Sequence, residues 1–288
     1  MAKTILITGT STGFGRKTAE TLAHADHQVF ATMRDPASKN REHAEALRTQ
    51  GIDVLELDVT DTASVNTAVE AVLAKAGRID VLVNNAGIAA AGVSEAFTPE
   101  QATALFDVNV VGLHRVARAV LPTMRSQNEG LIINIGSILG RVTFPFFGLY
   151  GASKFAVEGM TDSLRYELSQ LGIDVALVQP SAYPTQMYAS VTQPADTARA
   201  GAYGDVGAIP GTMFDHFNTM LSADDAPNPQ DIADAIAGLI NTPAGERPAR
   251  TVVGAAYGAD TVNDATSPVQ GGVVEALGLG HLATLKTA

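Results

Sequence analysis

The sequence predicts an α/β fold with a doubly wound parallel sheet of about seven strands and helices on both faces. Short apolar runs, typical of strands buried on both sides, alternate with longer segments of helical periodicity. Such a repeat is the pattern of parallel strands joined by crossover helices. Glycine or asparagine follows several of the apolar runs, as expected where strands end at a ligand-binding edge.

The elements are predicted in chain order. Helical patterns separate the strands, and the second helix shows apolar spacing at Val65, Val69 and Val72. Because crossovers are right-handed, all strands should end at one edge of the sheet, where we expect the functional residues. The predicted strands are residues 5–8, 27–32, 53–57, 80–83, 131–135, 174–178 and 250–253, and the helices are 14–25, 62–76, 99–125 and 150–171.

Two segments differ from this repeat. Residues 183–228 are rich in alanine, glycine, proline and aspartate, which predicts a mobile, partly helical lid over a substrate rather than a second domain. The tail from about residue 255 is rich in glycine and alanine, with a short helix expected near 270–278. Residues 1–288 are therefore predicted to form a single domain.

Composition excludes several classes of function. The net charge of −11 argues against a nucleic-acid surface and against attraction to anionic membranes. The chain has no cysteine, which rules out disulfides, thiolate catalysis and cysteine-based metal sites. No apolar run approaches the ~18 residues of a membrane span, and no signal-peptide pattern opens the sequence. We expect a cytoplasmic protein.

A glycine-rich turn joins the first predicted strand to the first helix. Glycines allow positive φ and close approach of a pyrophosphate, and a helix N-terminus offers free N–H groups with partial positive charge. Alone such a turn is weak evidence, but at the opening of a βαβ unit it favours a dinucleotide site on a Rossmann-type fold. The turn reads Thr8-Gly9-Thr10-Ser11-Thr12-Gly13-Phe14-Gly15.

Four polar elements follow later in the chain. Each alone could be a turn, a helix cap or a helix surface, but together, in this order, they resemble the short-chain dehydrogenase/reductase family. The TGxxxGxG spacing of the glycine turn supports the same resemblance, which covers roughly residues 3–255 and is closest to the single-domain branch. The elements are Asn84-Asn85-Ala86-Gly87, Asn109, Ser137 and Tyr150-Gly151-Ala152-Ser153-Lys154.

The resemblance implies that four residues are catalytic and that no metal is needed. Tyr150 would exchange a proton with the substrate oxygen, which Ser137 would hold in place. Spacing of four puts Tyr150 and Lys154 on one helix face, where the ammonium should lower the phenol pKa from its usual value near ~10. Lys154 would also reach the nicotinamide ribose, and Asn109 would hold a water that relays protons to Lys154.

The cofactor is expected to be NADP(H). Where NAD-using members carry an acidic residue at the end of the second strand, this chain has Thr32, and Arg34 follows where a 2′-phosphate would lie. Alternatively, Arg34 is a solvated residue paired with Asp35. Cofactor contacts are implied for Gly9, Ser11, Thr12, Gly13, Phe14, Gly15, Arg34, Asp58, Val59, Asn85, Ala86, Gly87, Tyr150, Lys154, Pro180 and Thr185.

Some of these positions have open alternatives. Asp58 would hold the adenine together with Val59, but alone it could be a helix N-cap. Ser181 stands where the family has glycine, which leaves the local backbone geometry in question. Tyr183 either lines the site or packs in the core.

The predicted function is hydride transfer between NADP(H) and a carbonyl or secondary-alcohol substrate. The alternatives are a non-catalytic NADP(H)-binding protein, an NAD-preferring alcohol dehydrogenase of the same fold, and a sugar-nucleotide epimerase or dehydratase. An apolar small-molecule substrate is expected, and the run at residues 31–36 resembles members that act on hydroxysteroids or retinoids. The substrate pocket is expected to be built from residues after Gly87, from residues 139–149 and from the 183–228 lid. Its expected apolar wall consists of Phe144, Phe146, Phe147 and Leu149. The resemblance also implies a homodimer or homotetramer, associating through the helices at 99–125 and 150–171.

Overall fold

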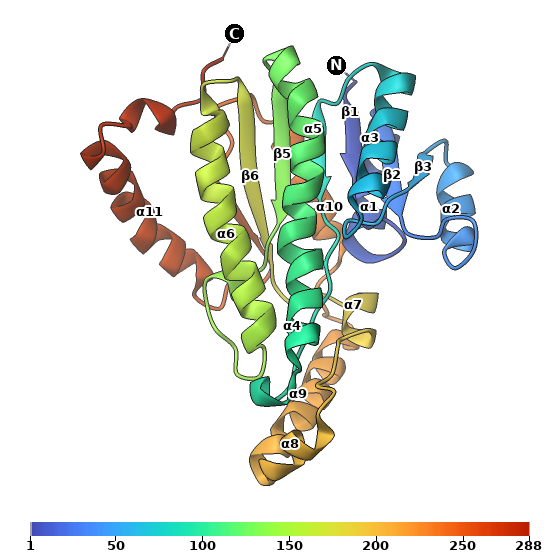
Figure 1. The fold of residues 1–288 in the computed structure, drawn as a ribbon, viewed down its shortest axis with the longest axis vertical. Coiled ribbons are helices and arrows are strands. Elements are labelled where there is room, and N and C mark those ends of the chain that lie inside the picture. The colour runs from blue at the N-terminus through green and yellow to red at the C-terminus, as the bar shows by residue number, and fades with distance from the viewer. Residues whose placement is uncertain (1, 288) are drawn as a thin grey trace.

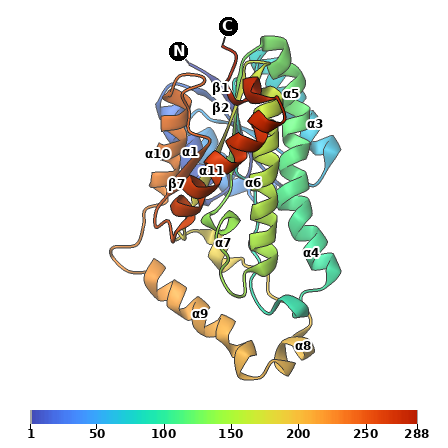
Figure 2. The ribbon, with the colours of Figure 1, turned by 90° about the vertical axis from the view of Figure 1, so that its left-hand side faces the viewer.

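The fold is a seven-stranded parallel sheet with helices on both faces, in a computed structural model that describes residues 2–287 (Figures 1 and 2). The strand order is β3-β2-β1-β4-β5-β6-β7. The predicted fold class and the seven predicted strands are confirmed. The strands are β1 (Thr4–Ile7), β2 (Gln28–Met33), β3 (Asp53–Glu56), β4 (Val81–Asn84), β5 (Gly130–Ile135), β6 (Ile173–Pro180) and β7 (Arg250–Val253).

The helices fill the connections between these strands. They are α1 (Gly13–His24), α2 (Arg41–Arg48), α3 (Thr62–Ala76), α4 (Pro99–Phe106), α5 (Leu113–Gln127), α6 (Gly148–Ser169), α7 (Gln186–Ala189), α8 (Thr197–Ala202), α9 (Asp205–Leu221), α10 (Gln230–Asn241) and α11 (Ala259–Ala276). Short 3₁₀ turns lie at Ser94–Ala96, Ile138–Gly140 and Gly280–Ala283. Within residues 2–287, none of the helices has the length and apolarity needed to cross a membrane.

Alternation along the strands divides the core into two layers. Ile5 and Ile7 of β1 face one layer and Leu6 faces the other, because successive side chains of a strand point to opposite faces. The first layer is completed by apolar residues of α1, α2 and α10, and the second by residues of α3, α5 and α6. All three β1 side chains are fully buried. The sheet is therefore held rigidly from both sides.

The strand order reverses between β1 and β4, which are neighbours in the sheet. Chains wound outward in both directions leave a crevice at the carboxyl ends of such strands, and ligands bind there. The glycine turn follows β1, the Asn84–Gly87 run follows β4, and Ser137 follows β5. The topology thus brings motifs far apart in the sequence to one edge of the sheet.

The prediction of a single helix over residues 99–125 is wrong for the middle of this range. A turn of π-helix, Asp107–Gly112, separates α4 from α5. Asn109 lies in that turn, where its side chain bonds both the N–H and the carbonyl of Ile88. A π-turn is a local irregularity frequent at functional sites, and sequence periodicity does not reveal it.

The tail also differs from its prediction, because α11 begins at Ala259 rather than near residue 270. Pro268 and two internal glycines give this helix weak local propensity. Its first half is fixed by tertiary contact instead, since Asn263 is buried and donates to the Gln179 side chain on β6 (2.7 Å). Helices α2 and α10 were not identified from the sequence, although Ile232, Ile236 and Leu239 show helical spacing in α10.

Residues 183–228 contain α7, α8 and α9 and lie beyond the carboxyl ends of the strands (Figures 1 and 2). Helices α8 and α9 extend furthest from the sheet. Glu95 in the 3₁₀ turn before α4 accepts bonds from Arg199 (2.9 Å) and Tyr203 (2.8 Å) of this segment. The segment is thus partly helical, as predicted, and it is joined to the body by these side chains and by backbone bonds of Thr192 with Ala89 and Ala91.

Candidate active site

The glycine turn is shaped by close backbone approach. Gly9 has φ of +70°, and a Cβ there would lie 2.9 Å from the Cα of Ala86. A Cβ on Gly15 would collide with the Gly9 carbonyl oxygen and with the Asn85 amide. Thr12 is the N-cap of α1 but its side chain makes no cap bond in the described chain, which leaves N–H groups of the first turn available to an anion.

The run after β4 holds this turn in place. The Thr8 hydroxyl accepts bonds from the backbone N–H groups of Asn85 and Ala86, each at 3.0 Å. The Asn85 amide donates in return to the carbonyl oxygens of Thr8 and Gly9, each at 2.9 Å. Asn85 therefore links the two strand ends on either side of the switch point.

A groove runs from the glycine turn to the end of β2. Asp58 lies in it and accepts from Thr60, not from a helix terminus; the N-cap of α3 is Asp61. Burial acts to raise the pKa of Asp58, but the Thr60 bonds and the charge of Arg34 outweigh it and lower that pKa. The groove is lined by Gly9, Ser11, Thr12, Gly13, Phe14, Met33, Arg34, Lys39, Asn40, Leu57, Asp58, Val59, Asn85, Ala86, Gly87, Ile88, Val108, Thr185, Gln186, Met187 and Ser190.

The groove end at Arg34 is exposed and basic. Arg34 and Lys39 are both exposed there, and the Asn40 amide donates to the Arg34 carbonyl oxygen (2.7 Å). Within residues 2–287 no ion pair joins Arg34 to Asp35, so the pairing considered for Arg34 is not formed. Thr32 points into the core, where its hydroxyl donates to the Ile7 carbonyl oxygen. The groove therefore meets two cations at the β2 end, and Asp58 is the acidic residue in its lining.

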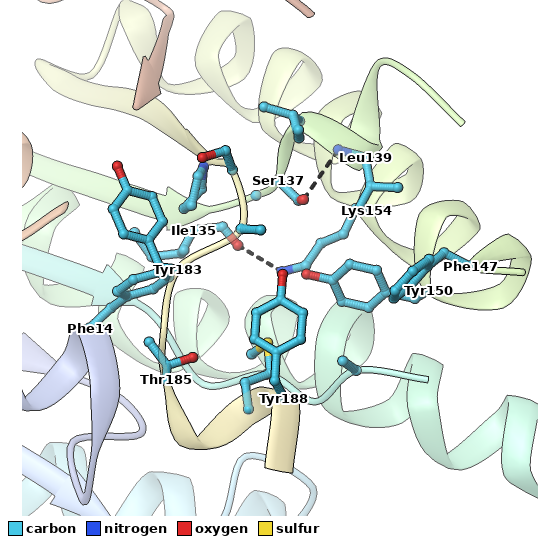
Figure 3. A pocket seen from close by; sticks show the side chains of 18 of the residues that line it. Phe14, Ile135, Ser137, Leu139, Phe147, Tyr150, Lys154, Tyr183, Thr185 and Tyr188 are labelled. Carbon is cyan, nitrogen blue, oxygen red and sulfur yellow. Dashed lines mark hydrogen bonds between the residues drawn. The ribbon is translucent and has the colours of Figure 1, made fainter. Parts of the chain in front are cut away.

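Ser137, Tyr150 and Lys154 line a second cavity that adjoins the groove (Figure 3). Lys154 Nζ donates to the Ile135 carbonyl oxygen (2.9 Å) and lies 5.7 Å from the centre of the Tyr150 ring. Ser137 Oγ accepts from the N–H of Leu139 (3.1 Å), which fixes its orientation. All three side chains are less than a tenth exposed. The structure thus brings together three of the four predicted catalytic residues at one cavity.

Burial controls the ionisation of this group. It raises the pKa of Tyr150 to about 12, against the opposing effect of a hydrogen bond with Ser137. It also lowers the pKa of Lys154 to about 8. The expected lowering of the phenol pKa by the ammonium is therefore wrong for the chain's own residues, because removal from water disfavours both charged forms. Tyr150 is held as a neutral phenol that carries its proton.

Asn109 lies behind this cavity rather than in its wall. It is 2% exposed, and its amide donates to the Ile88 carbonyl oxygen (2.9 Å) and to Ser153 Oγ (3.1 Å). Ser153 Oγ in turn donates to the Tyr150 carbonyl oxygen (2.7 Å). A Cβ on Gly87 would lie 3.3 Å from Asn109 Oδ1 and 3.9 Å from Lys154 Nζ. Asn109 therefore links the Tyr150 turn of α6 to the loop after Gly87.

The cavity wall is largely apolar, as expected, but only part of the predicted set forms it. Phe144 and Phe147 line the cavity, whereas Phe146 and Leu149 are not among its lining residues. Further wall residues are Leu139, Met187, Tyr188 and Phe217, which lie in the segments 139–149 and 183–228 where the pocket was expected, and Tyr257 from the tail. Among these, the 183–228 segment contributes Met187, Tyr188 and Phe217. Tyr257 lies outside the predicted pocket segments and was not predicted.

The structure answers the two questions left open for Tyr183 and Ser181, which lie in the segment after β6. Tyr183 both lines the cavity and packs in the core, since it is 1% exposed and its ring meets Phe14 edge-on at 5.5 Å. The Ser181 side chain occupies the space where a Cβ on Gly254 would lie, and Gly254 has φ of +86°. Because Gly254, in the turn after β7, has no side chain, the Ser181 side chain fits beside it. Pro180 lines the cavity, and Thr185 lines both the cavity and the groove.

Two polar residues at the β2 end of the groove were missed, and one predicted residue is placed differently. Lys39 and Asn40 were not predicted, although a lysine five residues beyond Arg34 was visible in the sequence. Gly15 does not line the groove; it lies beneath the turn, where its missing side chain allows the close approach described above. The other predicted cofactor residues line the groove or the cavity.

The chain was compared with known proteins. A family model described as short chain dehydrogenase matches residues 3–196. A 3-ketodihydrosphingosine reductase from Bacteroides thetaiotaomicron is 42% identical over 181 residues, which cover 63% of this chain and 64% of that protein. Retinol dehydrogenase 8 from Bos taurus is 33% identical over 246 residues, covering 83% of this chain and 78% of that protein.

Solved structures give the same result. A short-chain dehydrogenase from Streptomyces avermitilis superposes with a TM-score of 0.76 at 29% identity, covering 96% of both chains. A 3-ketoacyl-(acyl-carrier-protein) reductase from Brucella melitensis complexed with NADH has a TM-score of 0.72 at 27% identity, covering 87% of this chain and 96% of that one. Actinorhodin polyketide ketoreductase with NADPH has a TM-score of 0.73 at 28% identity, covering 90% and 97%.

These neighbours support a nicotinamide cofactor, and the groove fits one. It offers free N–H groups at the start of α1, a glycine turn open to close approach, and cations at its far end. Ser137, Tyr150 and Lys154 lie together at the adjoining cavity, and the family model matches residues 3–196. These findings show that the chain belongs to the short-chain dehydrogenase family of oxidoreductases.

Proposed function

We propose that this protein is an NADP(H)-dependent carbonyl reductase acting on an apolar small molecule, with Tyr150 as the proton donor. The observation that supports this best is the shared cavity of Ser137, Tyr150 and Lys154, which adjoins the groove at Asn85, Gly87 and Thr185. A carbonyl group placed in the cavity would face the nicotinamide end of the groove. Bound nicotinamide supplies the hydride.

The chain's own residues supply the proton and the orientation. Burial keeps Tyr150 as a neutral phenol, with a pKa raised to about 12, so it can donate a proton to the carbonyl oxygen as the alcohol forms. Ser137 Oγ holds that oxygen by hydrogen bonding, and Lys154 lies beside the Tyr150 ring to stabilise the developing phenolate. A protonated resting phenol favours reduction over alcohol oxidation, which requires phenolate.

Preference for NADP(H) is proposed on the charges at the β2 end of the groove. Arg34 and Lys39 line it, and the position where an acidic residue would meet a ribose hydroxyl is taken by the buried Thr32. Planar arginine suits a phosphate group, and lysine adds a second positive charge. The NADH-bound neighbour keeps NAD preference as the competing outcome.

The 183–228 segment is proposed to act as the substrate lid. Met187, Tyr188 and Phe217 come from it and form part of the cavity wall, so displacement of the segment would open the cavity to solvent. Association into a homodimer or homotetramer is a further proposal. It is supported by Val111 at the π-turn and Phe155 on α6, apolar side chains that are 45% and 44% exposed.

The test is a paired titration of NADPH and NADH, followed by the loss of nicotinamide absorbance on a panel of ketones and aldehydes. Tyr150→Phe should lower turnover by about a thousandfold and change NADPH affinity far less. Arg34→Ala should weaken NADPH about tenfold and leave NADH unchanged. Arg41→Ala is the matched control, because Arg41 is an exposed arginine of α2 outside the groove that pairs with Glu45.

The outcomes separate the candidate functions. Tighter binding of NADH than NADPH would overturn the cofactor assignment and support an NAD-preferring dehydrogenase. Turnover that survives Tyr150→Phe would overturn the assignment of the proton donor. Tight NADPH binding without turnover on any carbonyl compound would favour the non-catalytic binding protein.

A further inference from the structure

Besides Tyr150, the tyrosines that line the cavity are Tyr183, Tyr188 and Tyr257. Tyr188 lies on α7, the short helix that follows Thr185, and its backbone N–H donates to the Thr185 carbonyl oxygen (3.2 Å). Figure 3 shows its side chain directed into the cavity, with the hydroxyl towards the ends of Tyr150 and Lys154. The hydroxyl therefore reaches the place where the proposed chemistry occurs.

The ring of Tyr188 is held by packing rather than by polar contacts. It lies against Phe217 of α9, with ring centres 6.3 Å apart and planes tilted by 35°. Phe217 in turn meets Phe147 at 6.3 Å, and Phe147 meets Tyr150 at 6.4 Å. A continuous aromatic chain thus connects Tyr188 to the α6 helix that carries the proton donor, which fixes the direction of its hydroxyl.

That hydroxyl has no protein partner among residues 2–287. In contrast, Tyr183 donates to Asp231 (3.5 Å) and Tyr203 donates to Glu95 (2.8 Å). Burial and the neighbouring Tyr150 and Tyr257 raise the pKa of Tyr188, so it remains a neutral O–H donor. The Tyr188 side chain is partly buried in a largely apolar cavity, where a small number of polar groups orient a ligand, so this donor is placed to bond an acceptor atom of a ligand.

We propose that Tyr188 is a specificity-determining residue whose hydroxyl donates a hydrogen bond to a second oxygen of the substrate, close to the reacting carbonyl. The substrate class is a carbonyl compound with an oxygen substituent beside the carbonyl and an apolar remainder. The remainder would lie against Phe144, Phe147 and Phe217 of the wall. This inference rests on the proposed reductase function and adds the position of a second polar group to it.

The test uses a matched pair of substrates, a long-chain methyl ketone and the same ketone with a hydroxyl on its methyl carbon. The wild type should prefer the hydroxyketone, with a kcat/KM about tenfold higher. Tyr188→Phe keeps the ring and its packing and removes only the donor. It should abolish this preference, chiefly through KM, and leave the plain ketone within about twofold.

Tyr203→Phe is the control, because it removes a hydroxyl from the same segment that does not line the cavity. It should leave the ratio of the two substrates unchanged. A wild type with no preference, a Tyr188→Phe variant that keeps the wild-type ratio, or an equal loss on both substrates would each overturn the inference. If the wild type reduces plain ketones, the proposed function stands in all three cases; failure to reduce either substrate would count against the function itself.

Discussion

The glycine turn after β1 and the 183–228 segment both border the site, but they are held in place by different means. The turn is fixed by backbone contact, since Gly9 lies where a Cβ would meet the Cα of Ala86 at 2.9 Å, and Asn85 bonds two of its carbonyl oxygens. The 183–228 segment is held near Thr192 by backbone bonds with Ala89 and Ala91, and at its outer end by exposed side chains, where Glu95 bonds Arg199 and Tyr203.

This difference separates what is common to the family from what distinguishes one member. A dinucleotide phosphate is recognised by backbone N–H groups and a helix terminus, so its site demands one backbone shape. The substrate wall is made of side chains such as Tyr188 and Phe217, which can change without altering the sheet. Substitutions in the two regions should therefore differ sharply in their effects.

The largest loss of stability is expected for Gly15→Ala. The added Cβ would collide with the Gly9 carbonyl oxygen, which cannot move without displacing the turn. We expect a loss of about 2 kcal/mol in the free energy of unfolding and about tenfold or more in NADPH affinity. Denaturant unfolding and cofactor titration measure the two quantities.

Gly159→Ala is the matched control for this change. Gly159 is also helical, but a Cβ there meets nothing within 4 Å, so alanine should stabilise α6 by about 0.5–1 kcal/mol. If Gly15→Ala behaved like Gly159→Ala, the turn would be adaptable and the contrast between the two regions would disappear.

The same contrast explains how much the sequence could predict. The strands, the glycine turn and the Tyr150–Lys154 pair were predictable because each is encoded by neighbouring residues. The π-turn at Asn109 and the start of α11 were not, since both depend on distant partners, Ile88 and Gln179. The direction of the Tyr150 pKa shift was predicted wrongly because sequence spacing does not measure burial, and burial raises this pKa.

A second prediction concerns the pH dependence of turnover and rests on Lys154 of α6. Lys154 has a folded pKa lowered from 10.5 to about 8 by burial. Above pH about 8 it loses its charge, so carbonyl reduction should fall, whereas alcohol oxidation should rise with pH because it needs the Tyr150 phenolate. A profile of kcat in each direction measures this. A reduction rate that continues to rise above pH about 9 would contradict the assigned roles.

Burial of the Lys154 ammonium should also lower the free energy of unfolding. Between pH about 8 and 10.5 the unfolded chain holds more protons on Lys154 than the folded chain, so its contribution makes the free energy of unfolding rise with pH across this window. Below pH about 8 the full penalty applies. Lys154→Met should therefore raise the unfolding free energy at neutral pH by about 1–3 kcal/mol while lowering turnover. A variant less stable than the wild type at neutral pH would show that the bond to Ile135 outweighs the burial penalty.

The smallest effect is expected at the outer end of the 183–228 segment. Glu95→Gln weakens an exposed ion pair with Arg199, and such pairs contribute about 0.2–1 kcal/mol. Global stability should change little and NADPH affinity should not change, but a looser segment should raise KM for the carbonyl substrate about twofold. Glu129→Gln, which weakens exposed pairs with Lys3 and Arg78, is the control and should leave KM unaltered. A change in NADPH affinity on Glu95→Gln would mean that the 183–228 segment also stabilises the cofactor groove. The two regions would then not be independent of each other.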